Sequence, residues 1–279
     1  MRRRTVLGIA ALGALGATGL AGCADDQDER EEPRVASTSG GQRHDYGSDP
    51  EQHGTLFLPE GTPRGVVVVI HGGFWKAEYT AADLGTALAE DLAGRGWAAW
   101  NLEYRRVGNG GGVPATFDDV AAGIDHLATL DLDTTTVVTL GHSAGGHLAT
   151  WAAARAASGW PARVPVTHVI SQAGVLDLRA AARDDLGGGA VQALLGHPPT
   201  TADARFDPAQ ELPLDVPVWC VHGTADRIVP PAQSAQYVER ARAAGATAEL
   251  VEVDGDHFVV IDTASAAWEA QVGILDGIG

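Results

Sequence analysis

The feature that most constrains this chain is a serine set between glycines, at the point where an apolar run meets a helix-like stretch. Residues 141–145 read Gly-His-Ser-Ala-Gly; the run 137–140 precedes them and an Ala-rich stretch follows. A turn this tight, from a strand into a helix, strains the backbone of its central residue, and flanking glycines keep side chains out of the crowded space. We therefore predict that Ser143 is a nucleophile exposed above a sheet. The N–H of Ala144, at the helix N-terminus, is a candidate oxyanion donor.

The composition limits the class of protein. The chain has 279 residues, of which 45% are hydrophobic, and a formal charge of −17. It is long enough to bury the core of one large domain. Nucleic-acid binding requires a basic surface, so the acidic balance predicts no nucleic-acid partner. The composition leaves the oligomeric state open.

The beginning of the chain carries the pattern of a signal peptide. Three arginines at 2–4 precede an apolar stretch of small residues at 6–21. Residues 20–23, Leu-Ala-Gly-Cys, resemble a bacterial lipobox, which implies cleavage before Cys23 and lipid modification of that cysteine. We therefore expect residues 1–22 to be a signal peptide, and the protein to be exported as a lipoprotein held at the outer face of the cell membrane by Cys23. A short transmembrane anchor is the alternative.

The export route stays open, because residues 3–7, Arg-Arg-Thr-Val-Leu, also resemble a twin-arginine signal, while general secretory export fits the same segment. Residues 23–50 are polar and rich in Asp, Glu, Gln, Ser and Gly, and they predict a disordered tether. Cys220 is the second of two cysteines and sits in an apolar run, so we expect it in the core. Two cysteines in these settings predict neither a disulfide framework nor a metal site.

Beyond residue 50 the chain alternates between apolar strand-like runs and helical patterns. The predicted strands are 54–58, 66–70, 98–102, 137–140, 167–171, 218–221 and 249–253. Helical periodicity follows Ser143 and also covers 84–92, 117–127, 232–244 and 264–275. Continuous apolar strands that alternate with helices predict an α/β domain over 51–279, with a mostly parallel central sheet and helices on both faces. Such sheets carry their chemistry at the carboxyl ends of the strands.

The end of the predicted strand 66–70 is followed by His71-Gly72-Gly73-Phe74-Trp75. Two glycines let the backbone come close to a ligand. We therefore expect the N–H of Gly73 or of Phe74 to be the second oxyanion donor, beside that of Ala144. We expect His71 to support this loop.

Two further strand ends supply an acid and a base. Asp226 follows the strand 218–221, and His257 follows the strand 249–253. The chain order nucleophile, acid, base then predicts a catalytic triad of Ser143, Asp226 and His257. Asp254 and Asp256 are alternative acids, although they lie too close to His257 in sequence to reach its ring easily. His142 and His147, which flank the serine, are expected to be packing or polar-support residues.

These motifs resemble the α/β-hydrolase superfamily over nearly all of residues 51–279. The loop at 71–75 is also similar to the His-Gly-Gly-x-Trp loop of kynurenine formamidases and related small esterases, as are the segments 101–106 and 175–179. The resemblance implies the α/β-hydrolase fold and a serine hydrolase. An arylformamidase, a serine peptidase or amidase, and a non-catalytic envelope binding protein on the same fold are the alternatives.

The expected substrate is a small-molecule ester. Export favours esters outside the cell, and the segment 177–215 is short and polar, which argues against the large interfacial lid of a triglyceride lipase. We therefore expect a carboxylic ester hydrolase for short-chain or aryl esters. It would act through an acyl-enzyme on Ser143, without metal or organic cofactor.

Overall fold

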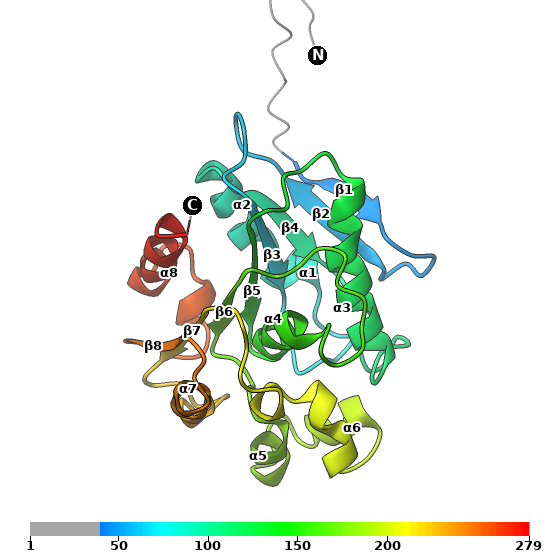
Figure 1. Ribbon diagram of the computed structural model, residues 1–279, viewed down its shortest axis with the longest axis vertical. Helices are drawn as coiled ribbons and strands as arrows, with labels where there is room; N and C mark the ends of the chain where they lie inside the picture. Colours follow the sequence, from blue (N-terminus) through cyan, green and yellow to red (C-terminus); the bar gives the residue numbers. More distant parts are fainter. Residues whose placement is uncertain (1–39, 279) are drawn as a thin grey trace, which may run out of the picture. The chain divides into compact units, whose positions relative to one another are not determined.

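The computed structural model describes residues 40–278. The predicted signal peptide at 1–22 and the lipidation site Cys23 lie outside the described residues. Within the described part, one eight-stranded sheet runs in the order β1-β2-β4-β3-β5-β6-β7-β8. Figure 1 shows this sheet at the centre of the domain, with the helices around it.

The strands from β3 onward pair in parallel, whereas β2 pairs antiparallel with β1 and with β4. The strands are β1 Gln42–Asp45, β2 His53–Phe57, β3 Val66–Ile70, β4 Ala98–Leu102, β5 Val137–His142, β6 His168–Gln172, β7 Val218–Gly223 and β8 Ala248–Val253. The parallel strands point their carboxyl ends to one edge of the sheet, so the loops after β3, β5, β7 and β8 share that edge.

Helices cover both faces of the sheet. The α-helices are α1 Ala81–Leu84, α2 Thr86–Gly94, α3 Ala115–His126, α4 Ala144–Ala154, α5 Leu178–Arg183, α6 Ala190–Leu195, α7 Ala232–Ala243 and α8 Ala266–Asp276. Short 3-10 helices are η1 Leu127–Thr129, η2 Thr201–Phe206, η3 Pro208–Gln210 and η4 Val259–Ile261. None of the helices in residues 40–278 is both long and apolar enough to cross a membrane.

The central strand β3 supplies both hydrophobic cores. Its five residues are all buried, and alternate side chains enter opposite faces. Val66, Val68 and Ile70 join the core formed with α3, α4 and α7, and Val67 and Val69 join the core formed with α2 and α8. Burial on both faces explains why this strand reads as a continuous apolar run, and confirms the predicted helix–sheet–helix arrangement.

The folded domain begins earlier than the boundary that we placed at residue 51. Gln42–Asp45 forms the edge strand β1, and Arg43 pairs with Thr55 in the register of β2. The prediction of a disordered tether over 23–50 is therefore wrong at its C-terminal end. The reason is that β1 is an edge strand with mostly exposed side chains, so its residues show no apolar alternation.

Candidate active site

The turn after β5 has the geometry expected of a strained elbow. Ser143 has φ +57° and ψ −117°, a conformation that non-glycine residues rarely adopt, and it immediately precedes α4. Its N–H donates to the carbonyl oxygen of Gln172 at 2.8 Å. A Cβ at Gly145 would lie 2.0 Å from the carbonyl oxygen of Ile70, and one at Gly141 would lie 2.1 Å from that of Gly145. Only glycine fits at both positions.

The acid and the base are in direct contact. Oδ2 of Asp226 lies 2.6 Å from Nδ1 of His257, and both side chains are buried. Oδ1 of Asp226 accepts the N–H groups of Ile228 and Val229 at 2.8 and 2.9 Å. Asp256, one of the alternative acids, instead accepts the N–H of Phe258 at 3.0 Å. The geometry therefore selects Asp226 as the partner of the imidazole.

A second histidine shares the same carboxylate, and the sequence analysis missed it. Nε2 of His222 lies 3.2 Å from Oδ2 of Asp226 and 3.0 Å from the carbonyl oxygen of Val229. Its Nδ1 lies 2.7 Å from Oγ of Ser234. The available signal was the position of His222 as the next-to-last residue of β7, four residues before the acid.

This environment keeps Asp226 ionised. Burial opposes the charge, but the hydrogen bonds from His222 and His257 and from the backbone outweigh burial and hold the pKa of Asp226 well below its usual range. A carboxylate that stays charged fixes the Nδ1–H tautomer of His257, which leaves Nε2 free to accept a proton.

The loop after β3 lies against the elbow. A Cβ at Gly72 would lie 2.7 Å from the carbonyl oxygen of His142 and 3.1 Å from Cβ of Ser143. Gly73, Phe74 and Trp75 have successive φ values of +103°, +51° and +56°. The structure thus brings the loop that carries two of the predicted oxyanion donors next to the serine, and Ala144, the third, is the first residue of α4.

The three residues of the predicted triad are less accessible than we predicted. Ser143 is 2% exposed, Asp226 7% and His257 3%, so the expectation of a serine exposed above the sheet is wrong. Gly72 of the loop after β3 lies directly against Ser143, and the neighbouring His142 packs against His257. The rings of His142 and His257 lie 4.5 Å apart between centroids, and Nε2 of His142 lies 2.9 Å from the carbonyl oxygen of His257.

The remaining histidines near the serine are buried supports, in line with the prediction. Burial, and then the charge of His257, lowers the pKa of His142 to about 3. Burial lowers the pKa of His147 to about 4, and its Nε2 lies 2.7 Å from the carbonyl oxygen of Phe206. Neutral rings held in this way bind backbone carbonyl groups.

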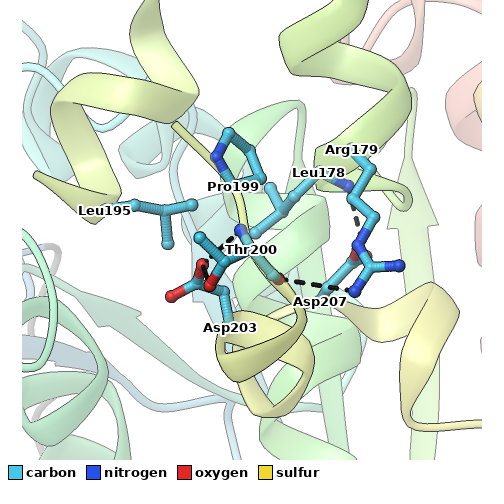
Figure 2. Close-up of a pocket in the computed structure, with 7 residues that line it drawn as sticks. All are labelled: Leu178, Arg179, Leu195, Pro199, Thr200, Asp203 and Asp207. Atoms are coloured by element: carbon cyan, nitrogen blue, oxygen red, sulfur yellow. Dashed lines mark hydrogen bonds between the residues drawn. The ribbon is translucent and has the colours of Figure 1, made fainter. Parts of the chain in front are cut away.

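The segment between β6 and β7 carries two helices of six residues, α5 and α6, and the 3-10 helices η2 and η3. A shallow surface hollow lies within this segment, lined by Leu178, Arg179, Leu195, Pro199, Thr200, Asp203 and Asp207. Figure 2 shows its polar groups bonded to one another, with Asp203 on Thr200 and Asp207 on the N–H of Leu178. None of the predicted site residues lines it.

Comparison with known proteins identifies relatives at the level of family and fold. Residues 56–240 match the family described as BD-FAE. No curated protein matches the chain in sequence.

Similar solved structures include a truncated carbohydrate esterase from gut microbiota, with a TM-score of 0.74, 21% identity and coverage of 88% of this chain and 99% of that one. A second is the esterase Est2 of Thermogutta terrifontis with bound butyrate, with a TM-score of 0.68, 23% identity and coverage of 86% and 93%. A third is the bifunctional GH43-CE protein of Bacteroides eggerthii, with a TM-score of 0.73, 23% identity and coverage of 85% of this chain but only 38% of that one. These likenesses establish the α/β-hydrolase fold that the sequence motifs implied.

Proposed function

The chain belongs to the BD-FAE family, and from this premise we propose that it is a serine hydrolase of carboxylic esters. The observation that carries the proposal is the strained backbone of Ser143 at the carboxyl end of β5. The Asp226–His257 hydrogen bond lies at the same end of the parallel strands. A nucleophile on a strand-to-helix elbow, together with an oriented imidazole, is the arrangement that acyl transfer requires.

The proposed mechanism assigns one role to each group. Nε2 of His257 removes the proton of Ser143 as its oxygen attacks the ester carbonyl, and then protonates the leaving alcohol. Asp226 holds the imidazole in the correct tautomer and stabilises its charged form. The N–H groups of Ala144 and of Gly73 or Phe74 stabilise the oxyanion. Water activated by His257 then hydrolyses the acyl-enzyme, and no step needs a metal or an organic cofactor.

The proposed substrates are short-chain or aryl esters, including acyl groups carried on carbohydrates. The similar structures are described as a carbohydrate esterase and as an esterase with bound butyrate, which supports this class. Exposed aromatic rings also flank the site. Phe258 is 50% exposed with its ring 5.3 Å from that of His257, and Tyr79 is 40% exposed at the position that a Cβ on Gly73 would strike. Flat apolar rings of this kind pack well against a planar or cyclic ester.

Acyl-chain length tests this proposal. We expect kcat/KM for p-nitrophenyl acetate or butyrate to exceed that for palmitate by on the order of 100-fold, because the segment between β6 and β7 offers only six-residue helices to cover a long chain. The measurement is initial rates over the three chain lengths, with the matching anilides as the control for amidase activity. A preference for palmitate that rises at a lipid interface, or faster turnover of the anilide, would contradict the proposal.

We also propose that the enzyme is a lipoprotein at the outer face of the cell membrane. The support is the sequence of residues 20–23 after an apolar stretch. Replacing Cys23 with Ala is expected to abolish incorporation of labelled palmitate and to release the protein from the membrane fraction or leave it unprocessed. Cys220→Ala is the control and should keep the label, because Cys220 is buried in the fold. Normal processing and membrane association of the Cys23 variant would refute lipidation.

A further inference from the structure

The loop that carries two of the proposed oxyanion donors is held by hydrogen bonds from the segment that follows β4. We call residues 71–75 the oxyanion loop. The hydroxyl of Tyr104 donates to the carbonyl oxygen of His71 at 2.8 Å, and the N–H of Val107 donates to that of Trp75 at 2.8 Å. The segment after β4 therefore holds the two ends of a loop whose backbone is strained in between.

Glu103 is the centre of this support. The residue is 3% exposed, and its Oε1 lies 3.0 Å from Nε2 of His71 and accepts the N–H of Tyr104 at 3.0 Å. Its Oε2 accepts the N–H of Ala81 at 2.8 Å. The other ring nitrogen of His71 lies 2.8 Å from the carbonyl oxygen of Gly72. Burial, and then the charge of Arg106, lowers the pKa of His71 to about 3, so the ring is neutral and its single N–H can donate to only one of these two acceptors. The His71 ring thus lies between the Glu103 carboxylate and Gly72, the glycine that lies against Ser143.

A buried guanidinium competes for the same carboxylate. Arg106 is 1% exposed, pairs with both Glu103 and Glu51, and places Nη1 3.3 Å from Nε2 of His71. Burial lowers the pKa of Arg106, and the Glu51 carboxylate opposes this effect. Glu51 therefore neutralises part of the Arg106 charge, which Glu103 would otherwise have to neutralise alone.

Glu51 comes from the N-terminal segment that leads from β1 into β2. The same segment holds the backbone of Glu103, because the hydroxyl of Tyr46 donates to its carbonyl oxygen at 2.8 Å and the carbonyl oxygen of His53 accepts its N–H at 2.9 Å. The hairpin of β1 and β2 is thus linked to the oxyanion loop through Glu103, which contacts His71.

We propose that Glu51 is a positioning residue for the oxyanion loop, acting through Arg106, Glu103 and His71. Without the Glu51 carboxylate, Arg106 keeps only Glu103 as its counter-ion and draws Oε1 away from His71. The ring of His71 then loses its fixed orientation, and the backbone of Gly72 and Gly73 shifts relative to Ser143. An oxyanion donor displaced in this way stabilises the transition state less, while the bound substrate is little affected. This inference rests on the proposed esterase function.

The test compares Glu51→Gln with a neighbouring control in the full chain. We expect Glu51→Gln to lower kcat for p-nitrophenyl acetate about tenfold with KM within about twofold, and to weaken inhibition by phenylboronic acid, a tetrahedral mimic, by the same factor. Glu51→Asp, which keeps the charge, should recover part of kcat. Arg105→Gln breaks the adjacent ion pair with Asp119, whose Nη2–Oδ1 distance is 2.7 Å and which does not involve the loop, and should leave kcat unchanged.

Amide hydrogen exchange gives a readout that does not depend on activity. Residues 72–75 should exchange faster in Glu51→Gln than in the wild type, whereas Arg105→Gln should match the wild type. If the wild type hydrolyses no ester, the proposed function fails, and the exchange rates alone then decide whether Glu51 orders the loop. Unchanged kcat, boronate affinity and exchange in Glu51→Gln would overturn the inference, as would equal losses in both variants.

Discussion

Replacing Ser143 with Ala is expected to lower kcat by on the order of 10³-fold or more while the domain stays folded. The reason is that the hydroxyl is the proposed nucleophile, and its removal takes away the covalent step. Alanine tolerates the elbow backbone no worse than serine does, and only one oxygen is lost from a site that is 2% exposed. The measurement pairs ester hydrolysis with circular dichroism.

The matched control is Ser171→Ala. Ser171 is another buried serine, on β6, where it pairs with Gly141 in the strand register. A fluorophosphonate probe should label the wild type and Ser171→Ala but not Ser143→Ala. A folded Ser143→Ala protein that keeps most of its activity, or that still reacts with the probe, would show that the elbow assignment is wrong.

His257→Ala is expected to cost as much as the loss of the serine, because the nucleophile and its base act as a unit. The double variant Ser143→Ala with His257→Ala should then be barely worse than either single variant. Losses that add up fully on a logarithmic scale would mean that the two side chains act in separate steps.

Much of the architecture was predictable because the central strands are buried on both faces. The predicted runs 66–70 and 98–102 coincide with β3 and β4, whose residues are all buried. Strands of this kind leave a continuous apolar signature, with turn residues at each end. The helix predicted over 84–92 is interrupted at Gly85, which separates α1 from α2. A Cβ at Gly85 would lie 2.1 Å from Oδ1 of Asn101.

The edge strand, the burial of the site and the support of the loop were not predictable from the sequence pattern. Gln42–Asp45 is polar and held by pairing with β2, so it carries no apolar periodicity. Ser143 lies against Gly72 of the loop after β3, which is distant from it in sequence. Likewise, Glu51 and Glu103 meet at Arg106 only because β2 pairs with β4. Contacts between residues distant in sequence leave no local signal.

The narrower resemblance to kynurenine formamidases rests on short segments and stays a prediction. Its loop motif is present, yet the segment that it resembles at 101–106 contains Glu103 and Arg106, which serve here to support that loop. The motif therefore indicates how the oxyanion loop is supported, and enzymes that act on different acyl substrates can share this support. Comparing the rates for p-nitrophenyl esters and for the matching anilides separates ester hydrolysis from amide hydrolysis.

Asp226→Asn is expected to lower kcat by about 10⁴-fold, a larger effect than the loss of one hydrogen bond would give. The carboxylate accepts from four donors, namely the N–H groups of Ile228 and Val229, Nδ1 of His257 and Nε2 of His222. Asparagine has one acceptor oxygen. If that oxygen stays on the two backbone N–H groups, the amide N–H faces Nδ1 of His257 and stabilises the tautomer with its proton on Nε2. That tautomer cannot accept the proton of Ser143.

The measurement is kcat for p-nitrophenyl acetate between pH 5 and 9, with circular dichroism as the check on folding. Because hydrogen bonds hold the pKa of Asp226 well below its usual range, the wild-type carboxylate stays charged across this window, so the variant should be impaired at every pH in it. Asp256→Asn is the matched control and should keep activity near the wild-type value, since Asp256 accepts from Phe258 and not from the imidazole. If Asp226→Asn is active while the Ser143 and His257 variants are inactive, the acid role passes to Asp254 or Asp256, and the short Asp226–His257 contact has only a structural role.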